Sequence, residues 1–162
     1  MLVKDALKIT DSFTKTSKMP GLSYSLPAWA CQTGAKLRKI PTSPCFGCYA
    51  MKNNYTRYPA IKEAQYRRLD AINHPQWVEA MVTQIKRQKW FRWHDAGDLQ
   101  SKEHMAKIIE VCKLTPDTQH WLPTQERQYL PKPEEVPENL IIRLSAAKVD
   151  GTAGNAWSHS ST

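Results

Sequence analysis

Residues 89–94, KWFRWH, followed by residues 95–98, DAGD, decide the fold class of this chain. The first segment is short and aromatic-rich, which favours a β-strand, and the second is a polar turn that ends it. Ser101 follows as a candidate N-cap for a helix that would extend through Leu114. A strand, a polar turn and a capped helix in direct succession predict an α/β fold.

The same alternation continues on both sides of this stretch. Downstream, a strand over residues 119–123 ends at Thr124, and a third over residues 140–144 ends at Ser145. Upstream, residues 22–27 alternate apolar and polar side chains, and helices are expected over residues 59–72 and after residues 73–75. Strands separated by helices pair in parallel through right-handed crossovers.

The chain has 162 residues, which suits one domain but falls short of the roughly 250 residues of a complete eight-stranded α/β barrel. We therefore expect a partial, incomplete TIM-like barrel with parallel strands and a cysteine-rich loop near the strand carboxyl ends. Residues 1–20 are expected to be an irregular lead-in, and residues 21–149 a single α/β domain that includes the cysteine loop, 31–52. Residues 150–162 are expected to form a weakly ordered tail.

Three cysteines mark a candidate metal site in this loop. Cys45 and Cys48 form a C-x-x-C pair with Gly47 inside it, and Cys31 lies upstream across a loop that can fold back. No apolar stretch resembles a secretory signal, so a reducing, cytoplasmic compartment is expected, where cysteines bind metals more often than they form disulfides. Three thiolates would leave one iron of a [4Fe-4S] cluster open. The alternatives are zinc with His94 as a fourth ligand, and three buried free cysteines.

Polar residues end the strands at the edge where parallel α/β folds collect their chemistry. We expect these residues to line one pocket beside the cysteines and to bind an anionic small molecule. The alternative is a structural ion-pair network between the arginines and the aspartates. The predicted pocket residues are Arg92, His94, Asp95, Gly97, Asp98, Arg143 and Ser145.

The net charge of +8 favours a phosphate-bearing substrate or a polyanionic partner, although a solvated basic surface would have the same composition. A nucleic-acid-binding module stabilised by zinc is therefore the second hypothesis, with basic helices and Tyr55, Tyr58 and Tyr66 as its binding surface. No run of about 18 apolar residues is available to cross a membrane.

Four segments carry a resemblance to a known family: residues 17–21 (SKMPG), 31–41 (CQTGAKLRKIP), 45–50 (CFGCYA) and 92–101 (RWHDAGDLQS). Together they resemble the bacteriophage gene product 88 family over about residues 17–160. The resemblance implies a phage or prophage origin and the cytoplasm of an infected or lysogenic bacterium. It also implies that relatives continue into a further cysteine-rich segment, whereas this chain stops at Thr162, so that a ligand from such a segment could complete the site.

The cysteine segment is also similar, more weakly, to the radical S-adenosylmethionine enzymes. In that family three cysteines hold a [4Fe-4S] cluster, and the open iron binds the amino and carboxylate groups of S-adenosylmethionine. The resemblance implies the same roles for Cys31, Cys45 and Cys48, with residues 95–98 as a turn that contacts the cofactor. The spacing departs from the family's C-x3-C-x2-C pattern, because thirteen residues separate Cys31 from Cys45.

Overall fold

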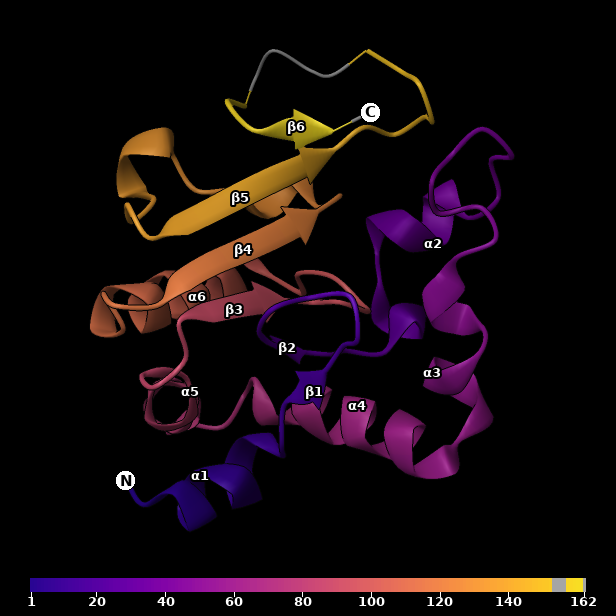
Figure 1. The fold of residues 1–162 in the computed structure, drawn as a ribbon. Helices are drawn as coiled ribbons and strands as arrows, with labels where there is room; N and C mark the ends of the chain where they lie inside the picture. The colour runs from indigo at the N-terminus through magenta and orange to yellow at the C-terminus, as the bar shows by residue number, and fades with distance from the viewer. Residues whose placement is uncertain (153–156, 162) are drawn as a thin grey trace.

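A six-stranded sheet organises the chain in the computed structural model, which describes residues 1–152 and 157–161 (Figure 1). The strands lie in the order in which they occur in the sequence, and all neighbours from β2 onward are parallel, whereas β1 is antiparallel to β2. The strands are β1 (Thr14–Lys15), β2 (Leu22–Tyr24), β3 (Trp90–Trp93), β4 (Gln119–Thr124), β5 (Leu140–Ser145) and β6 (Ser160–Ser161).

α-Helices connect β2 to β3 and β3 to β4, whereas only 3-10 turns lie between β4 and β5. α5 (Trp77–Ile85) and α6 (Lys102–Leu114) pack on one face of the sheet, and α6 lies behind β3 and β4 in Figure 1. The expected cap is present, because the Ser101 hydroxyl accepts a hydrogen bond from the backbone N–H of His104 at 3.0 Å. The α-helices are α1 (Val3–Thr10), α2 (Thr33–Leu37), α3 (Asn54–Arg57), α4 (Pro59–Ala71), α5 (Trp77–Ile85) and α6 (Lys102–Leu114). Short 3-10 turns occur at η1 (Ala28–Ala30), η2 (Tyr49–Met51), η3 (Arg127–Tyr129) and η4 (Pro133–Glu135).

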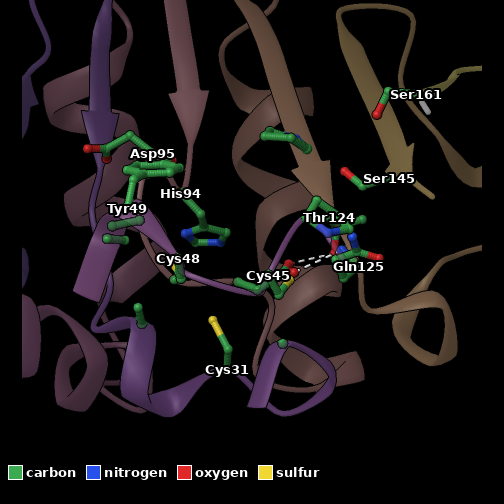
Figure 2. A pocket seen from close by; sticks show the side chains of 18 of the residues that line it. Cys31, Cys45, Cys48, Tyr49, His94, Asp95, Thr124, Gln125, Ser145 and Ser161 are labelled. Atoms are coloured by element: carbon green, nitrogen blue, oxygen red, sulfur yellow. Dashed lines mark hydrogen bonds between the residues drawn. The ribbon is translucent and has the colours of Figure 1, made fainter. Parts of the chain in front are cut away.

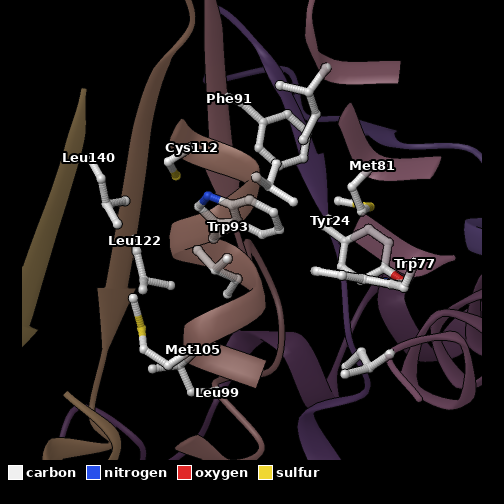
Figure 3. Packing of buried hydrophobic residues seen from close by; sticks show 14 of the residues in the cluster. Tyr24, Trp77, Met81, Phe91, Trp93, Leu99, Met105, Cys112, Leu122 and Leu140 are labelled. Atoms are coloured by element: carbon white, nitrogen blue, oxygen red, sulfur yellow. The ribbon is translucent and has the colours of Figure 1, made fainter. Parts of the chain in front are cut away.

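The hydrophobic core lies between the sheet and these helices (Figure 3). Alternate strand residues point into it, because successive side chains of a strand face opposite sides of the sheet. The aromatic rings pack edge to face, for example Phe91 on Trp93 with ring centroids 5.0 Å apart. Strand residues of this core include Tyr24, Phe91, Trp93, Leu122 and Ile142, and helix residues include Trp77, Met81, Ile108 and Cys112.

The α/β class and the parallel pairing of the three expected strands are confirmed, and the sheet is not closed into a barrel in the described part of the chain. Over the same residues, no helix combines the length and the apolar character that crossing a membrane requires.

Both chain ends are more regular than the sequence predicted. The lead-in over residues 1–20 was expected to be irregular, but it forms α1 and β1, and α1 packs against α4 and α5. Ala6 and Thr10 are the buried residues of α1, and with Val3 and Leu7 they recur at the i, i+3, i+4, i+7 spacing of an amphipathic helix, a local signal that the expectation of an irregular lead-in overlooked. In the expected tail, Ser160–Ser161 pairs with β5; residues 153–156 and 162 lie outside the described residues.

Candidate functional site

A pocket of about 280 Å³ lies at the carboxyl ends of the strands (Figure 2). Each loop that follows a parallel strand contributes to its wall, which is where parallel α/β folds place their ligands. The cysteine segment that follows β2 forms the opposite wall. The lining includes Cys31, Gly34, Cys45, Cys48, Tyr49, Arg92, His94, Asp95, Gly97, Asp98, Thr124, Gln125, Ser145 and Ser161.

The three predicted cysteines all line this pocket. All three are free thiols and line the same cavity, although Cys31 comes from the end of η1 and the other two from the turn before η2. A methyl group built on Gly34 would lie 3.8 Å from the Sγ atoms of both Cys31 and Cys45, so these two sulfurs flank the glycine. Within the described residues, no group of three His, Cys, Asp or Glu side chains is arranged to hold a single metal ion.

Burial favours the protonated form of the Cys31 and Cys45 thiols, because it raises the pKa of both. It raises the pKa of Cys31 to about 12, and the neighbouring Asp98, Cys48 and Cys45 act in the same direction. Burial also raises the pKa of Cys45. A bound cation would supply the positive charge that stabilises the thiolates, and its binding would release protons.

Glu126 holds the cysteine segment against the end of β4, and the sequence analysis missed this residue. Its buried carboxylate accepts hydrogen bonds from the backbone N–H groups of Gln32 at 3.2 Å and Thr33 at 2.7 Å, and from the Thr33 hydroxyl at 2.7 Å. The side chain of Gln32 bonds in turn to the carbonyl of Gln100 and to the hydroxyl of Tyr129. The only sequence signal for this role is the position of Glu126, two residues after the polar strand end.

Asp95 is buried and fully engaged in hydrogen bonds. Its Oδ1 accepts from the hydroxyls of Ser23 at 2.5 Å and Ser25 at 2.6 Å, and its Oδ2 accepts from Tyr55 at 2.9 Å. The hydroxyl of Tyr49 donates to the backbone carbonyl of Asp95. These bonds fix the turn after β3 to β2 and to the segment after Cys48. The role of Asp95 in this structure is therefore to position the pocket wall.

Asp98 makes the corresponding link to β4. Its Oδ1 accepts from the hydroxyl of Thr124 at 2.6 Å and from the N–H of Leu99 at 2.8 Å, and its Oδ2 accepts from the N–H of Gln125 at 2.9 Å. Burial raises the pKa of Asp98 to about 6, against the lowering effect of these hydrogen bonds, and nearby Glu126 raises it further.

His94 presents an unpaired nitrogen at the pocket. Its Nδ1 lies 3.2 Å from the carbonyl oxygen of Tyr24, while its Nε2 is buried and has no hydrogen-bond partner within the described residues. Burial lowers the pKa of His94 to about 4, so the ring is neutral near pH 7. If Nδ1–H donates to Tyr24, Nε2 carries a lone pair that can accept a hydrogen bond or bind a metal.

The two predicted arginines are separated rather than paired. Arg92 lines the pocket, and its Nε has no hydrogen-bond partner in the described part of the structure. Arg143 is exposed and absent from the lining, so the prediction that both guanidiniums reach one depth is wrong. The register shows why the two depths differ: Arg92 lies at the level of Trp121 and Ile141, so Arg143 lies two residues nearer the carboxyl ends of the strands than Arg92.

The remaining predicted pocket residues, Ser145 and Gly97, both line the cavity. The expected ion-pair network is wrong as well, because the ion pairs of the described residues lie elsewhere, at Met1–Glu79, Lys8–Asp5 and Arg67–Asp11. The aspartates instead accept hydrogen bonds from hydroxyl and backbone N–H groups, which leaves the Arg92 guanidinium free of a carboxylate partner.

The fold and the site together define a mixed α/β domain with a cysteine-lined pocket at the carboxyl edge of its sheet. The family model described as gene product 88 matches residues 1–159, and the chain belongs to this family. No curated protein and no solved structure matches the chain significantly. The match identifies the family to which the sequence segments pointed, and it adds no support for the resemblance to the radical S-adenosylmethionine enzymes.

Proposed function

We propose that this protein binds an iron–sulfur cluster through Cys31, Cys45 and Cys48 and uses the adjoining pocket to bind an anionic small molecule. The observation that carries the proposal is the convergence of three free thiols on one cavity. The hydrogen bonds between Glu126 and the start of α2 hold this cysteine segment against the sheet, so that a residue that is not itself a proposed ligand fixes the position of Cys31.

We propose a cluster rather than a single ion because the described residues contain no compact set of three ligands for one ion. Thiolates on one zinc ion, with Zn–S bonds of about 2.3 Å, must all lie within about 4 Å of one another. Cysteines of a [4Fe-4S] cluster bind different irons and therefore stand further apart. The described residues contain no compact group for one ion, whereas the sulfurs of Cys31 and Cys45 flank Gly34 at the edge of an open cavity.

The pocket beside the cysteines suits a ligand with a carboxylate or phosphate group. Arg92 offers a guanidinium with no carboxylate partner, Ser145 and Ser161 offer hydroxyls at the rim, and Asp95 and Asp98 are already engaged. Neutral His94 would accept a hydrogen bond from an amino group. S-adenosylmethionine carries both groups and is our candidate ligand, and a cluster with an open iron would supply electrons and a binding position for it.

We interpret the open sheet as an incomplete TIM-like barrel, since its parallel strands carry helices on one face and the candidate site at their carboxyl ends. We place the protein in the cytoplasm of an infected or lysogenic bacterium, where a reducing environment would keep the thiols available. The family name, gene product 88, supports a phage origin.

A zinc-stabilised nucleic-acid-binding module is the second candidate, and His94 is the observation that favours it. Histidine ligands of metals commonly donate their second ring N–H to a carbonyl, as the Nδ1 of His94 can do to Tyr24. The Nε2 of His94 would then complete a Cys3His site after the sulfurs draw together. Of the three tyrosines predicted for nucleic-acid binding, Tyr55 donates a hydrogen bond to Asp95. The other two are exposed: Tyr58 lies at the N-terminal end of α4, and Tyr66 lies on α4 itself.

Metal analysis after anaerobic purification tests the proposal. We expect the wild type to hold about four iron and about four sulfide per chain and to show visible absorption from thiolate-bound iron. Cys45→Ala is expected to lose most of the iron. Cys112→Ala is the matched control, because Cys112 is a free thiol buried in the core on α6, away from the pocket.

One zinc per chain without iron would contradict the iron–sulfur proposal and favour the zinc-stabilised nucleic-acid-binding module. A wild type that contains neither metal after reconstitution with iron, sulfide or zinc would refute both. Equal iron loss in Cys45→Ala and Cys112→Ala would show that the iron depends on the general stability of the fold rather than on the three cysteines.

A further inference from the structure

The sheet has a second face that no helix of the described chain covers, and we call it the open face. Because Phe91 and Trp93 point into the core, Trp90 and Arg92 point the other way. The exposure of the strands agrees: 43% of Trp90 and 47% of Ile141 are accessible, although both are large apolar residues in the middle strands. The residues of the open face are Ser23, Trp90, Arg92, Gln119, Trp121, Pro123, Ile141 and Arg143.

Cations lie over both indole rings of the open face. The Cζ of Arg92 is 4.8 Å from the ring centroid of Trp121, and the Nζ of Lys89 is 5.4 Å from that of Trp90. Trp90 and Trp121 also line one hollow of about 140 Å³, together with Arg92 and the segment Met19–Gly21. Aromatic surface and positive charge are therefore interleaved over neighbouring strands.

The accessible charges of the open face are positive. No residue of strands β1 to β6 is acidic, and the chain as a whole carries a net charge of +8. Arg143 is exposed at the level of Pro123, and Arg92 keeps an unpaired Nε. The carboxylate of Asp95, which is bonded to Ser23 at one edge of this face, is buried and engaged in hydrogen bonds. Lys89 and Arg143, by contrast, are exposed, so the accessible part of the face attracts a polyanion.

We propose that the open face binds single-stranded nucleic acid, with bases stacked on Trp90 and Trp121 and phosphates bound by Lys89, Arg92 and Arg143. An indole ring can stack on any base, because every base has a flat π face. A guanidinium beside the indole can bind a phosphate and can also make a cation–π contact with the stacked rings. A duplex would hide its bases from the indoles. This proposal requires no metal at the cysteine site, and it concerns a surface other than the tyrosines at Tyr58 and Tyr66.

Fluorescence anisotropy with labelled 20-nucleotide dT and rU strands tests the proposal, with and without metal loading. We expect binding of both strands, and preference over a 20-base-pair duplex. Trp90→Ala should weaken binding about tenfold through lost stacking. Trp29→Ala is the matched control and should leave the affinity unchanged, since Trp29 is a similarly exposed indole, at 36% against 43% for Trp90, with Lys62 over its ring, but lies in η1 outside the sheet. Tyr66→Ala reports separately on the helical surface.

The salt dependence separates the phosphate contacts from the stacking. Arg143→Gln should reduce the slope of log affinity against log salt concentration by about 0.7, whereas Lys113→Gln, an exposed residue on α6, should not change it. Both substitutions are at exposed positions, and circular dichroism would confirm that the variants are folded. A preference for dT or rU would identify the kind of strand that the face takes.

Three results would overturn the inference. These are an absence of binding at about 0.1 mM protein, equal affinity for duplex and single strand, and an affinity that falls in Tyr66→Ala but not in Trp90→Ala. The last result would assign nucleic-acid binding to the helical surface instead. Because the assay is run on metal-free and metal-loaded protein, its failure is independent of the failure of the cluster proposal.

Discussion

The carboxylate of Glu126 accepts two hydrogen bonds from Thr33, one from the backbone N–H and one from the hydroxyl, each of 2.7 Å, across 93 positions of sequence. This contact joins the loop after β4 to the first residue of α2, two residues after Cys31. The position of one cysteine of the candidate site therefore depends on a carboxylate from the opposite wall of the pocket.

Removal of this carboxylate should destabilise the protein and lower its metal content. Glu126→Ala leaves the partly buried N–H groups of Gln32 and Thr33 without their acceptor, and we expect the free energy of unfolding to fall by about 2 kcal/mol. Urea denaturation would measure the change. Glu110→Ala, at an exposed position on α6, should change it by less than about 0.5 kcal/mol. Equal effects of the two substitutions would contradict the role assigned to Glu126.

Gly97 is the glycine that the turn after β3 requires. Its φ is +79°, and a Cβ at this position would meet the Cβ of Leu26 at 2.5 Å and its carbonyl oxygen at 2.8 Å. Gly97→Ala should cost about 3 kcal/mol or more of stability, since backbone strain and a clash act together. Gly47 has a φ of +69° but an open environment, so Gly47→Ala should cost only about 1 kcal/mol. Thermal or urea unfolding compares the two, and a smaller loss for Gly97→Ala would refute the clash.

His120 should contribute to a loss of stability in mild acid, in the same direction as His94 and His104, whose pKa values burial also lowers. Burial lowers the pKa of His120 from 6.5 to about 4, so the unfolded chain takes up a proton at a higher pH than the folded one. The contribution of His120 to the free energy of unfolding is constant above about pH 6.5 and is lost progressively toward pH 4, by roughly 3 kcal/mol. Asp98 acts with the opposite sign between about pH 6 and 4, because its pKa is raised.

The contribution of His120 is isolated by measuring the free energy of unfolding of a His120 variant and of the wild type at each pH and taking the difference. His120→Phe keeps a ring that can stack on Trp93, where the His120 ring now lies at an interplanar angle of 18°. We expect the stability of the variant relative to wild type to stay constant down to about pH 6.5 and to improve from there to about pH 4.5. The contributions of Asp98 and of the other histidines are present in both proteins and cancel in this difference. A difference that stays constant across this range would show that His120 does not titrate as its burial predicts.

The pocket ligand should depend on Arg92 and not on Arg143. On cluster-loaded protein, calorimetry should show that Arg92→Gln binds S-adenosylmethionine about tenfold more weakly than wild type, because a charged hydrogen bond is lost. Arg143→Gln is the matched control, since Arg143 lies outside the pocket lining. If wild type binds no better than Arg92→Gln, this ligand does not use the pocket guanidinium.

The sequence by itself determined the α/β class, the parallel strands and the capped helix after Ser101. These features follow from local patterns, because strand alternation, helix caps and turn residues depend mainly on near neighbours. The polar strand ends were also predicted from the sequence to gather at one edge, because parallel strands bring their carboxyl ends together, and the pocket that the structure has there is lined by the three cysteines and by His94, Thr124 and Ser145.

Only the tertiary structure decided which side chains meet there. The stagger between β4 and β5 places Ile141, and not Arg143, at the level of Arg92, because strand register is set by packing between distant segments rather than by either strand alone. In the same way, Asp95 takes its partners from Ser23, Ser25 and Tyr55, and Glu126 takes Thr33. A buried carboxylate must find donors, but the folded chain determines which donors are within reach.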